Sequence, residues 1–410
     1  MHNIAGSLYK MNNTSNSFSQ VQESSSTSQE EETLSSSTAT SQEQMTTTST
    51  SQEKTVSSTS SSSSSYVETS ESDSVISETV KEISSTASSV KEHSNKQEIS
   101  EPQIVSEYYV QALGGEHYTY CPSCITEGSI SAVFYCQNKD SGIVRDHIYS
   151  DVEQNGVKRT QIALAPGTGW DNMHVCDPTV IKMKTTYKDK AYNYVMFYLG
   201  CSTTNCKDNR IGIALSNSLS EKFIRPDNNM LLSIDYDPND KDSIQWGVGQ
   251  ASAIALDDTR CLLFYTKGDP TVFSTFVCIV DLADMQNIKI SESVKLSKKG
   301  INTNITNADL GYDKENKVLY MICDKLPFTP IIPEGSIVWS TQVQNLADLK
   351  QYSDVVWEQV KTIDNKITGY PKNHNCGFIR DNNGYISGSP RVLATVSTDY
   401  LWGYRIKEVK

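Results

Sequence analysis

Residues 176–216 read CDPTVIKMKTTYKDKAYNYVMFYLGCSTTNCKDNRIGIALS and contain three runs typical of β-strands. The first run, 176–181, is short and begins with small or polar residues. The second, 194–199, is rich in aromatic residues, and the third covers 210–214. Short apolar runs separated by Gly, Asn and Asp indicate strands joined by turns. This stretch therefore predicts consecutive strands of one sheet.

The same order of runs recurs further along the chain, and its first runs contain Asp177, Ser252, Asp309 and Gly377. These residues are 75, 57 and 68 positions apart, and the strands expected between 131 and 165 supply a fifth unit. Repeated sheets with small, polar first strands are what a β-propeller requires, because those strands crowd around a central channel. We predict an all-β fold, a five-bladed β-propeller. A two-sheet β-sandwich is the alternative, since it also gives short strands with regular turns.

The chain has 410 residues, and its N-terminal quarter differs sharply from the rest. Residues 21–70 contain 30 Ser and Thr, too little apolar surface to offset the entropy of ordering. We therefore predict a disordered, low-complexity tail over 1–103 and the propeller over 104–410. A Ser/Thr-rich tail is typical of stalks on secreted proteins, so we expect an extracellular or cell-surface location, although a cytosolic phospho-acceptor tail has a similar composition. No signal peptide is visible after Met1.

The charge distribution argues against several classes of partner. Residues 1–102 carry 5 Lys and 14 Asp or Glu, so −9 of the net −13 lies there and −4 remains for the rest. A nucleic-acid binder needs a basic face, so we expect no nucleic-acid partner. No apolar run of about 18 residues is present, so no membrane span is expected. We predict a monomer with no cofactor and no metal.

Three short motifs carry a family resemblance: Trp170 to Pro178 (WDNMHVCDP), Ile211 to Ser216 (IGIALS) and Gly247 to Ser252 (GVGQAS). Together they resemble the five-bladed furanosidase propellers, glycoside hydrolase families 43 and 32. The resemblance implies an Asp general base, a second Asp that tunes its neighbours, and a Glu general acid. Asp177 matches the first position and Asp309 the second. Where the Glu should open a first strand the chain has His374 and Asn375, and Glu127 is the substitute acid, in a different blade.

First strands of a propeller begin at one mouth of its channel, so polar residues at that register should gather there. We expect Asp177, Asp309 and His374 to face one pocket. The residues expected to bind substrate with them are Trp170, His174, Gln250, Ser252, Asn307, His374 and Asn375. Aromatic rings at Trp170, Trp246 and Tyr370 could stack on a sugar or pack between blades. Asp177 could equally be a turn cap before Pro178, and His174 a structural histidine.

Three functions follow. The first is a glycoside hydrolase in which Asp177 activates water and Asp309 orients it. The second is a non-catalytic glycan-binding or adhesive module on a secreted or cell-surface protein. This function is favoured because His374 and Asn375 stand where the Glu general acid is expected. The third is a scaffold that binds protein. In the first two the partner is a carbohydrate, an oligosaccharide or polysaccharide.

Two further local predictions concern cysteines and a turn. Cys201 and Cys206 flank a hairpin tip that a disulfide could bridge. The pair Cys121 and Cys124 lacks a second CxxC, which makes a structural zinc site a weak interpretation. Arg380 and Asp381 are expected in a turn that Gly384 completes.

Overall fold

The computed structural model describes residues 104–108, 118–138, 145–204, 208–234, 246–268, 273–301, 304–325, 334–398 and 403–409. The predicted tail, 1–103, lies outside these ranges, as does Cys206. Within them nearly all regular structure is β-strand, and the helical segments are η1 (Leu349–Ser353) and α2 (Asn365–Thr368). No helix in the described ranges is long and apolar enough to cross a membrane.

The strands form five antiparallel units, the blades. Blade 1 contains β2 (Thr119–Glu127), β3 (Ile130–Asn138), β4 (Asp146–Gln154) and β5 (Val157–Leu164). Blade 2 contains β6 (His174–Tyr187), β7 (Lys190–Cys201), β8 (Arg210–Ser216) and β9 (Met230–Leu232). Blade 3 contains β10 (Gly247–Ala255), β11 (Arg260–Gly268), β12 (Phe273–Asp281), β13 (Lys289–Ile290) and β14 (Val294–Lys295).

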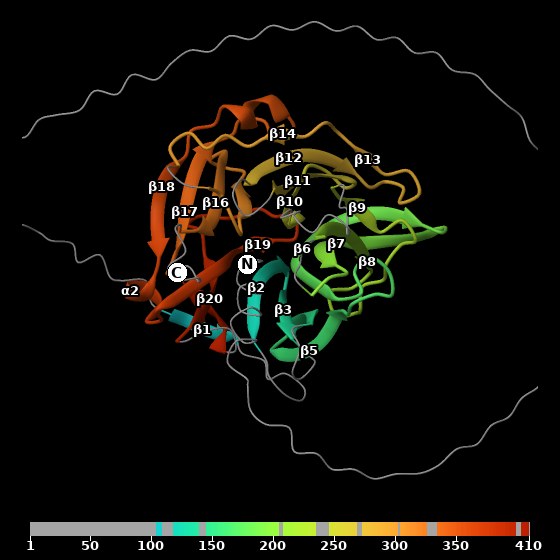
Figure 1. Ribbon diagram of the computed structural model, residues 1–410, viewed down its shortest axis with the longest axis horizontal. Helices are drawn as coiled ribbons and strands as arrows, with labels where there is room; N and C mark the ends of the chain where they lie inside the picture. The colour runs from blue at the N-terminus through green and yellow to red at the C-terminus, as the bar shows by residue number, and fades with distance from the viewer. Residues whose placement is uncertain are drawn as a thin grey trace, which may run out of the picture. The chain divides into compact units, whose positions relative to one another are not determined.

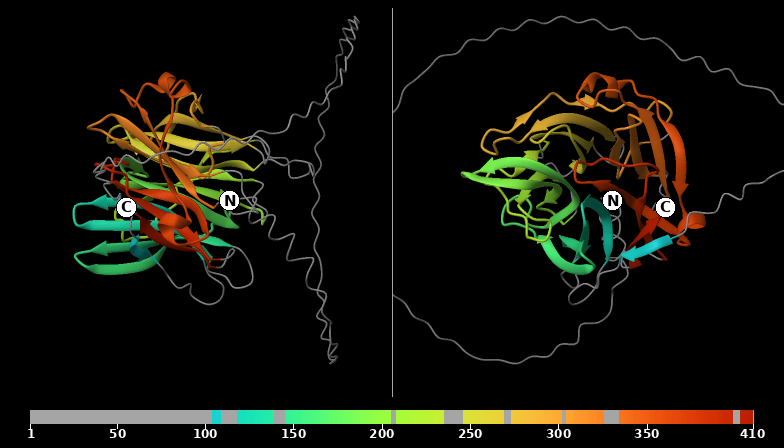
Figure 2. Two further views of the ribbon diagram at one scale, coloured as in Figure 1. Left: turned by 90° about the vertical axis from the view of Figure 1, so that its left-hand side faces the viewer. Right: turned by 180° about the vertical axis from the view of Figure 1, so that it is seen from behind.

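Blades 4 and 5 complete the set. Blade 4 contains β15 (Asp309–Asp313), β16 (Val318–Asp324), β17 (Ser336–Gln342) and β18 (Glu358–Ile363). Blade 5 contains β19 (Lys372–Asp381), β20 (Val392–Ser397), β21 (Arg405–Val409) and β1 (Ile104–Tyr108). The first strands β2, β6, β10 and β19 lie toward the centre of Figure 1, and strands such as β5, β13 and β18 lie at the rim. Figure 2 shows the same arrangement from the side and from behind.

The ring is closed by pairing between segments far apart in the sequence. β1 pairs antiparallel with β21, so the first described strand completes the last blade. β19 also pairs in parallel with β2, through Ile379 opposite Cys124 and the two residues that follow. Strands from both ends of the described chain therefore share one sheet. The pairing of β19 with β2 closes the ring between blades 5 and 1, so these two first strands leave no open sheet edge between them.

Each pair of neighbouring blades encloses one cluster of buried hydrophobic side chains. Phe197 and Leu263 belong to the cluster between blades 2 and 3, and Tyr135 and Leu393 to the one between blades 1 and 5. Further clusters join blades 1 and 2, blades 3 and 4, and blades 4 and 5. Burying one Phe or Leu side chain contributes about 1.5–3 kcal/mol. A cycle of five interfaces is a propeller and excludes the sandwich, so the predicted fold is confirmed.

The first strands approach one another closely at the centre. Gly377 in β19 lies against the carbonyl group of Pro122 in β2, and a Cβ atom added at Gly377 would collide with it. Only glycine fits here, because any Cβ atom would collide. The backbone itself does not require glycine, since the φ of Gly377 is not in the left-handed region. This contact fixes how near blades 1 and 5 come at the channel.

Arg380 differs from its prediction. It lies inside β19, is 2% exposed, and donates to the Leu310 carbonyl at 2.7 Å and to Thr179 Oγ1 at 3.0 Å. The turn begins one residue later, where Asp381 Oδ1 accepts the backbone N–H of Asn383 and Gly384 has φ +82°. The prediction for Asp381 and Gly384 is thus correct and that for Arg380 is wrong, because its guanidinium spans the axis between blades.

Candidate functional site

One residue of every blade adopts the left-handed backbone conformation near the start of the first strand. The φ angles lie between 46° and 56°, and the residues are Cys121, Asp177, Gln250, Asn307 and Asn375. The register of the first hairpin shifts at this point in blades 1, 2, 3 and 5. A non-glycine residue in this conformation costs of order 1 kcal/mol or more, so a fivefold repeat reflects a constraint of the fold. We call these residues the mouth ring.

All members of the mouth ring line a single cavity of about 20 Å³, together with Asp309 and Cys376. A water molecule needs about 10–15 Å³ of such volume, so the cavity admits a group the size of one hydroxyl. The structure therefore brings Asp177 and Asp309 to one pocket, which we call the mouth pocket. His374 does not line it.

Asp177 is almost completely buried, at 2% exposure. The thiol of Cys121 is hydrogen-bonded to it. Burial, followed by the negative charge of Asp177, raises the pKa of the Cys121 thiol well above its ordinary value. The Cys121 thiol therefore keeps its proton at neutral pH and donates a hydrogen bond to Asp177.

Asp309 has donors on both carboxylate oxygens. Ser252 Oγ donates to Oδ1 at 2.7 Å and the Phe378 backbone N–H to Oδ2 at 2.8 Å. Arg380 Nη1 lies 3.2 Å from Oδ1 as an ion pair. Donors from blades 3 and 5 thus fix Asp309 of blade 4. Ser252 acts by holding this carboxylate.

The amide side chains of the mouth ring form a chain of hydrogen bonds that ends on Asp324. Gln250 donates its amide to Asn307 Oδ1, and its own Oε1 accepts the Asn307 backbone N–H at 2.9 Å. Asn307 in turn donates to Asp324, which also accepts the Asn375 backbone N–H at 2.8 Å. His374 Nδ1 lies 2.9 Å from Asp324 Oδ2.

Asp324 explains why His374 does not reach the pocket. Its carboxylate is 1% exposed at the end of β16 and lies against the imidazole, whose ring packs on Tyr404 at 5.6 Å. Asp324 was not among the predicted site residues, because it ends a second strand and not a first one. A signal was present: an Asp directly after the apolar run of β16 is an expensive residue to bury without partners.

His174 lies beside a second buried acidic residue, Asp146, with its Nδ1 3.6 Å from Asp146 Oδ2. It is 2% exposed, and its Nδ1 accepts the Asp146 backbone N–H at 3.2 Å. Asp146 also accepts hydrogen bonds from the hydroxyls of Tyr118 and Tyr120. Burial raises the pKa of Asp146, but the contacts with His174 and the two tyrosines outweigh burial and lower it. His174 is thus part of the support of blades 1 and 2 and does not line the mouth pocket.

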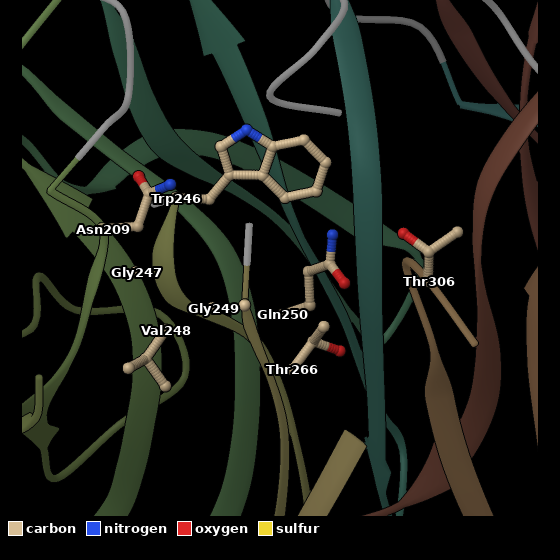
Figure 3. Close-up of a pocket in the computed structure, with 9 residues that line it drawn as sticks. Asn209, Trp246, Gly247, Val248, Gly249, Gln250, Thr266 and Thr306 are labelled. Carbon is tan, nitrogen blue, oxygen red and sulfur yellow. The ribbon is translucent and has the colours of Figure 1, made fainter. Parts of the chain in front are cut away.

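Trp246 lies close to the mouth pocket. With Gln250, Thr266 and Thr306 it lines a second cavity of about 20 Å³, shown in Figure 3. Gln250 lines both cavities, so they are neighbours. Asn209 supports the tryptophan by donating its backbone N–H to the Trp246 carbonyl at 3.0 Å.

The other two aromatic candidates pack within blades. The Trp170 ring stacks on Tyr198, with centroids 5.8 Å apart, and its Nε1 donates to Asn229 at 3.3 Å. The Tyr370 ring lies under the Lys407 ammonium at 4.7 Å. Neither lines the two cavities at the mouth.

Glu127 lies at the other end of β2 from Cys121. Glu127 follows Cys121 by six positions along the strand, which corresponds to about 20 Å. Its carboxylate pairs with Lys182 and accepts a hydrogen bond from Tyr194. Burial raises the pKa of Glu127, but these two partners outweigh burial and lower it. The structure does not bring Glu127 to the mouth, and its partners keep it ionised, so its position corrects its expected place near the site.

A disulfide joins blades 1 and 2 next to Asp177 of the mouth ring. Cys136 of β3 and Cys176 of β6 are bonded, with their Cα atoms 5.3 Å apart. This pair was not predicted from the sequence, because 40 residues and a blade boundary separate its members. The predicted bridge from Cys201 involves Cys206, outside the described residues.

No family model and no curated protein matches the chain. Solved structures do. One whose title names BT0996 in an RGII complex is 16% identical, over 76% of this chain and 92% of its own, with a TM-score of 0.50. One titled "Glycoside hydrolase" is 15% identical over 75% and 91%, with a TM-score of 0.49. An endo-arabinase from Bacteroides thetaiotaomicron is 10% identical over 72% and 94%, with a TM-score of 0.46. The resemblance of this chain to the propeller glycoside hydrolases is a resemblance of fold.

Proposed function

We propose that the mouth of the channel binds a saccharide without hydrolysing it. The observation that carries this proposal is the composition of the mouth ring: three amides, one thiol and one carboxylate, Asp177. Amide groups both donate and accept, which suits sugar hydroxyls that do the same. None of the three amides or the thiol can act as the carboxylic acid that protonates a leaving group.

The size of the mouth pocket supports binding at the surface. A cavity of about 20 Å³ takes one hydroxyl group, whereas sites that enclose a ligand measure about 300 Å³ or more. The sugar ring would lie across the mouth with one hydroxyl inserted between Asp177 and Asp309. Trp246, half-buried beside Gln250, offers an apolar ring against which the sugar could stack.

Glycoside hydrolysis is the second candidate, favoured by the two carboxylates that line one pocket. Asp177 would then activate water and Asp309 would orient it. Asp309 accepts hydrogen bonds from Ser252 and the Phe378 backbone and pairs with Arg380, so its two oxygens are already engaged by the protein. Among the described residues that line the pocket there is no third carboxyl group to serve as the acid.

The first experiment measures binding and turnover on the same preparation. A glycan array selects ligands, calorimetry gives their Kd, and aryl furanosides report hydrolysis. We expect binding without turnover. Trp246→Ala should weaken binding about tenfold, equivalent to about 1.4 kcal/mol. Val360→Ala, on the exposed face of β18, is the matched control and should bind as the original chain does. Turnover that Asp177→Asn abolishes would establish the hydrolase instead.

The proposal also concerns where the domain works and in which oligomeric state. The Ser/Thr-rich residues 1–103 would act as a spacer, and the propeller from 104 would present its mouth to a carbohydrate outside the cell or on its surface. The domain would work as a monomer, because its ring is closed within one chain. Fractionation of the native host, with surface proteolysis, tests the location.

A further inference from the structure

Three potential metal ligands lie together beside the mouth pocket, and two of them line it. Cys121 Sγ, Cys136 Sγ and a carboxylate oxygen of Asp177 all lie within 4.8 Å of one another. They come from β2, β3 and β6, so two blades supply them. In tetrahedral zinc sites, metal–sulfur bonds of about 2.3 Å place ligand atoms roughly 3.8 Å apart. Each pair of ligand atoms here therefore needs to close by roughly 1 Å.

Cys136 is engaged in the disulfide with Cys176, so the cluster is incomplete as a metal site while that bond exists. A disulfide sulfur carries no thiolate charge and is a poor zinc ligand. Reduction would free both thiols at once. Cys176 directly precedes Asp177, and its Sγ lies 3.3 Å from Asp177 Oδ1. Once the disulfide is open, this side chain can therefore turn toward the other three groups and supply a fourth ligand.

We infer that the reduced protein binds one Zn²⁺ through Cys121, Cys136, Cys176 and Asp177, and that the Cys136–Cys176 disulfide prevents this binding. The inference does not rest on the proposed saccharide binding. A dithiol reductant transfers two electrons and two protons to the disulfide and itself becomes a disulfide. Zn²⁺ then replaces the protons of the three thiols, which pass to solvent.

Access and charge agree with this assignment. Cys121 and Asp177 line the mouth pocket, whose volume of about 20 Å³ accommodates a single ion. The described lining of that pocket contains no Lys or Arg that would repel a cation. Sulfur with one carboxylate is a donor set that favours Zn²⁺ over the hard cations Mg²⁺ and Ca²⁺.

Zinc titration of the full chain tests the inference in two independent ways. The oxidised protein should take up no zinc at the mouth, whereas the protein reduced with a dithiol, then freed of reductant, should bind one equivalent. Cys176→Ser leaves Cys136 without its partner, so this variant should bind zinc with no reduction at all. Cobalt(II) in place of zinc should give the visible absorption of tetrahedral thiolate ligation in both samples.

Further substitutions identify the ligands. In the Cys176→Ser background, Cys121→Ser and Asp177→Asn should each weaken zinc binding at least tenfold. Cys278→Ser, which changes a buried cysteine of β12 away from the mouth, is the matched control and should bind as its parent does. Melting curves verify that each variant is folded. The inference is overturned if neither the reduced protein nor Cys176→Ser binds zinc, or if Cys121→Ser binds it unchanged.

Discussion

Arg380 shows how much one side chain can do at the axis of a propeller. It belongs to blade 5, donates to groups of blades 2, 3 and 4, and pairs with Asp309 of the mouth pocket. Its burial is unusual, because arginine is almost never fully buried unless it is paired. The partners belong to three separate first strands, so they stay satisfied only while the blades keep their spacing. Arg380 is thus a positioning residue for Asp309 and a structural link between blades.

We predict that Arg380→Met destabilises the domain by about 3–5 kcal/mol, because Asp309 then loses its charged partner and the buried carbonyl groups of Ala253 and Leu310 lose a donor. Urea unfolding at pH 7 measures this. Arg260→Met is the matched control: Arg260 pairs with Asp257 at the surface, where such a pair contributes about 0–1 kcal/mol. Equal losses for both variants would contradict a special role for the axis.

The first strands of the blades could be predicted from the sequence, but the left-handed residues at their starts and the disulfide between blades could not. Alternating apolar runs identify β6, β7 and β8, and the recurrence of polar starts places Asp177, Ser252, Asp309 and Gly377 on first strands. The left-handed residues of the mouth ring could not be predicted, since no glycine marks them. Nor could the bond between Cys136 and Cys176, because it depends on which blades are neighbours. Arg380 was misassigned because Asp381, Asn382, Asn383 and Gly384 follow it and favour a turn.

We predict that β1 is needed to complete blade 5. A fragment of residues 104–410 should melt as the full chain does, because it retains the pairing of β1 with β21. A fragment that begins at residue 110 should melt at a lower temperature, since β21 then becomes an open sheet edge with unpaired backbone groups. Calorimetry of the three chains decides between these outcomes. If both fragments melt like the full chain, the strand is dispensable and the predicted boundary at 104 lies too early.

At the scale of the whole molecule, closure of the ring brings ionisable groups into the interior. Asp146 and Asp324 are buried with imidazole, hydroxyl or amide partners. Buried thiols and tyrosines belong to the hydrophobic clusters between blades. Burial raises the pKa of the thiols of Cys124, Cys323 and Cys376 to about 12. These thiols are neutral in the folded state at neutral pH. Their contribution to the free energy of unfolding is fully present below their unfolded pKa of 9.0 and is lost as the pH rises toward 12.

The stability of the fold at low pH depends on carboxylates whose pKa is lowered by folding. The pKa of Asp146 is lowered from 3.8 in the folded state, so its contribution to stability is present above that value and is lost as pH falls through the folded pKa. The lowered pKa of Glu127, Asp257 and Asp313 acts in the same direction, with less effect where these groups meet solvent. We therefore expect the free energy of unfolding to fall steeply below about pH 4.

Asp146→Asn should lower the free energy of unfolding at pH 7 by about 1–3 kcal/mol, because the hydroxyls of Tyr118 and Tyr120 lose their charged acceptor. It should also make the fall in stability below about pH 4, the acid limb of the curve, less steep. Glu221→Gln, at an exposed position, should leave the curve unchanged. An acid limb of the same slope in Asp146→Asn and in the original chain would show that other carboxylates set the acid sensitivity.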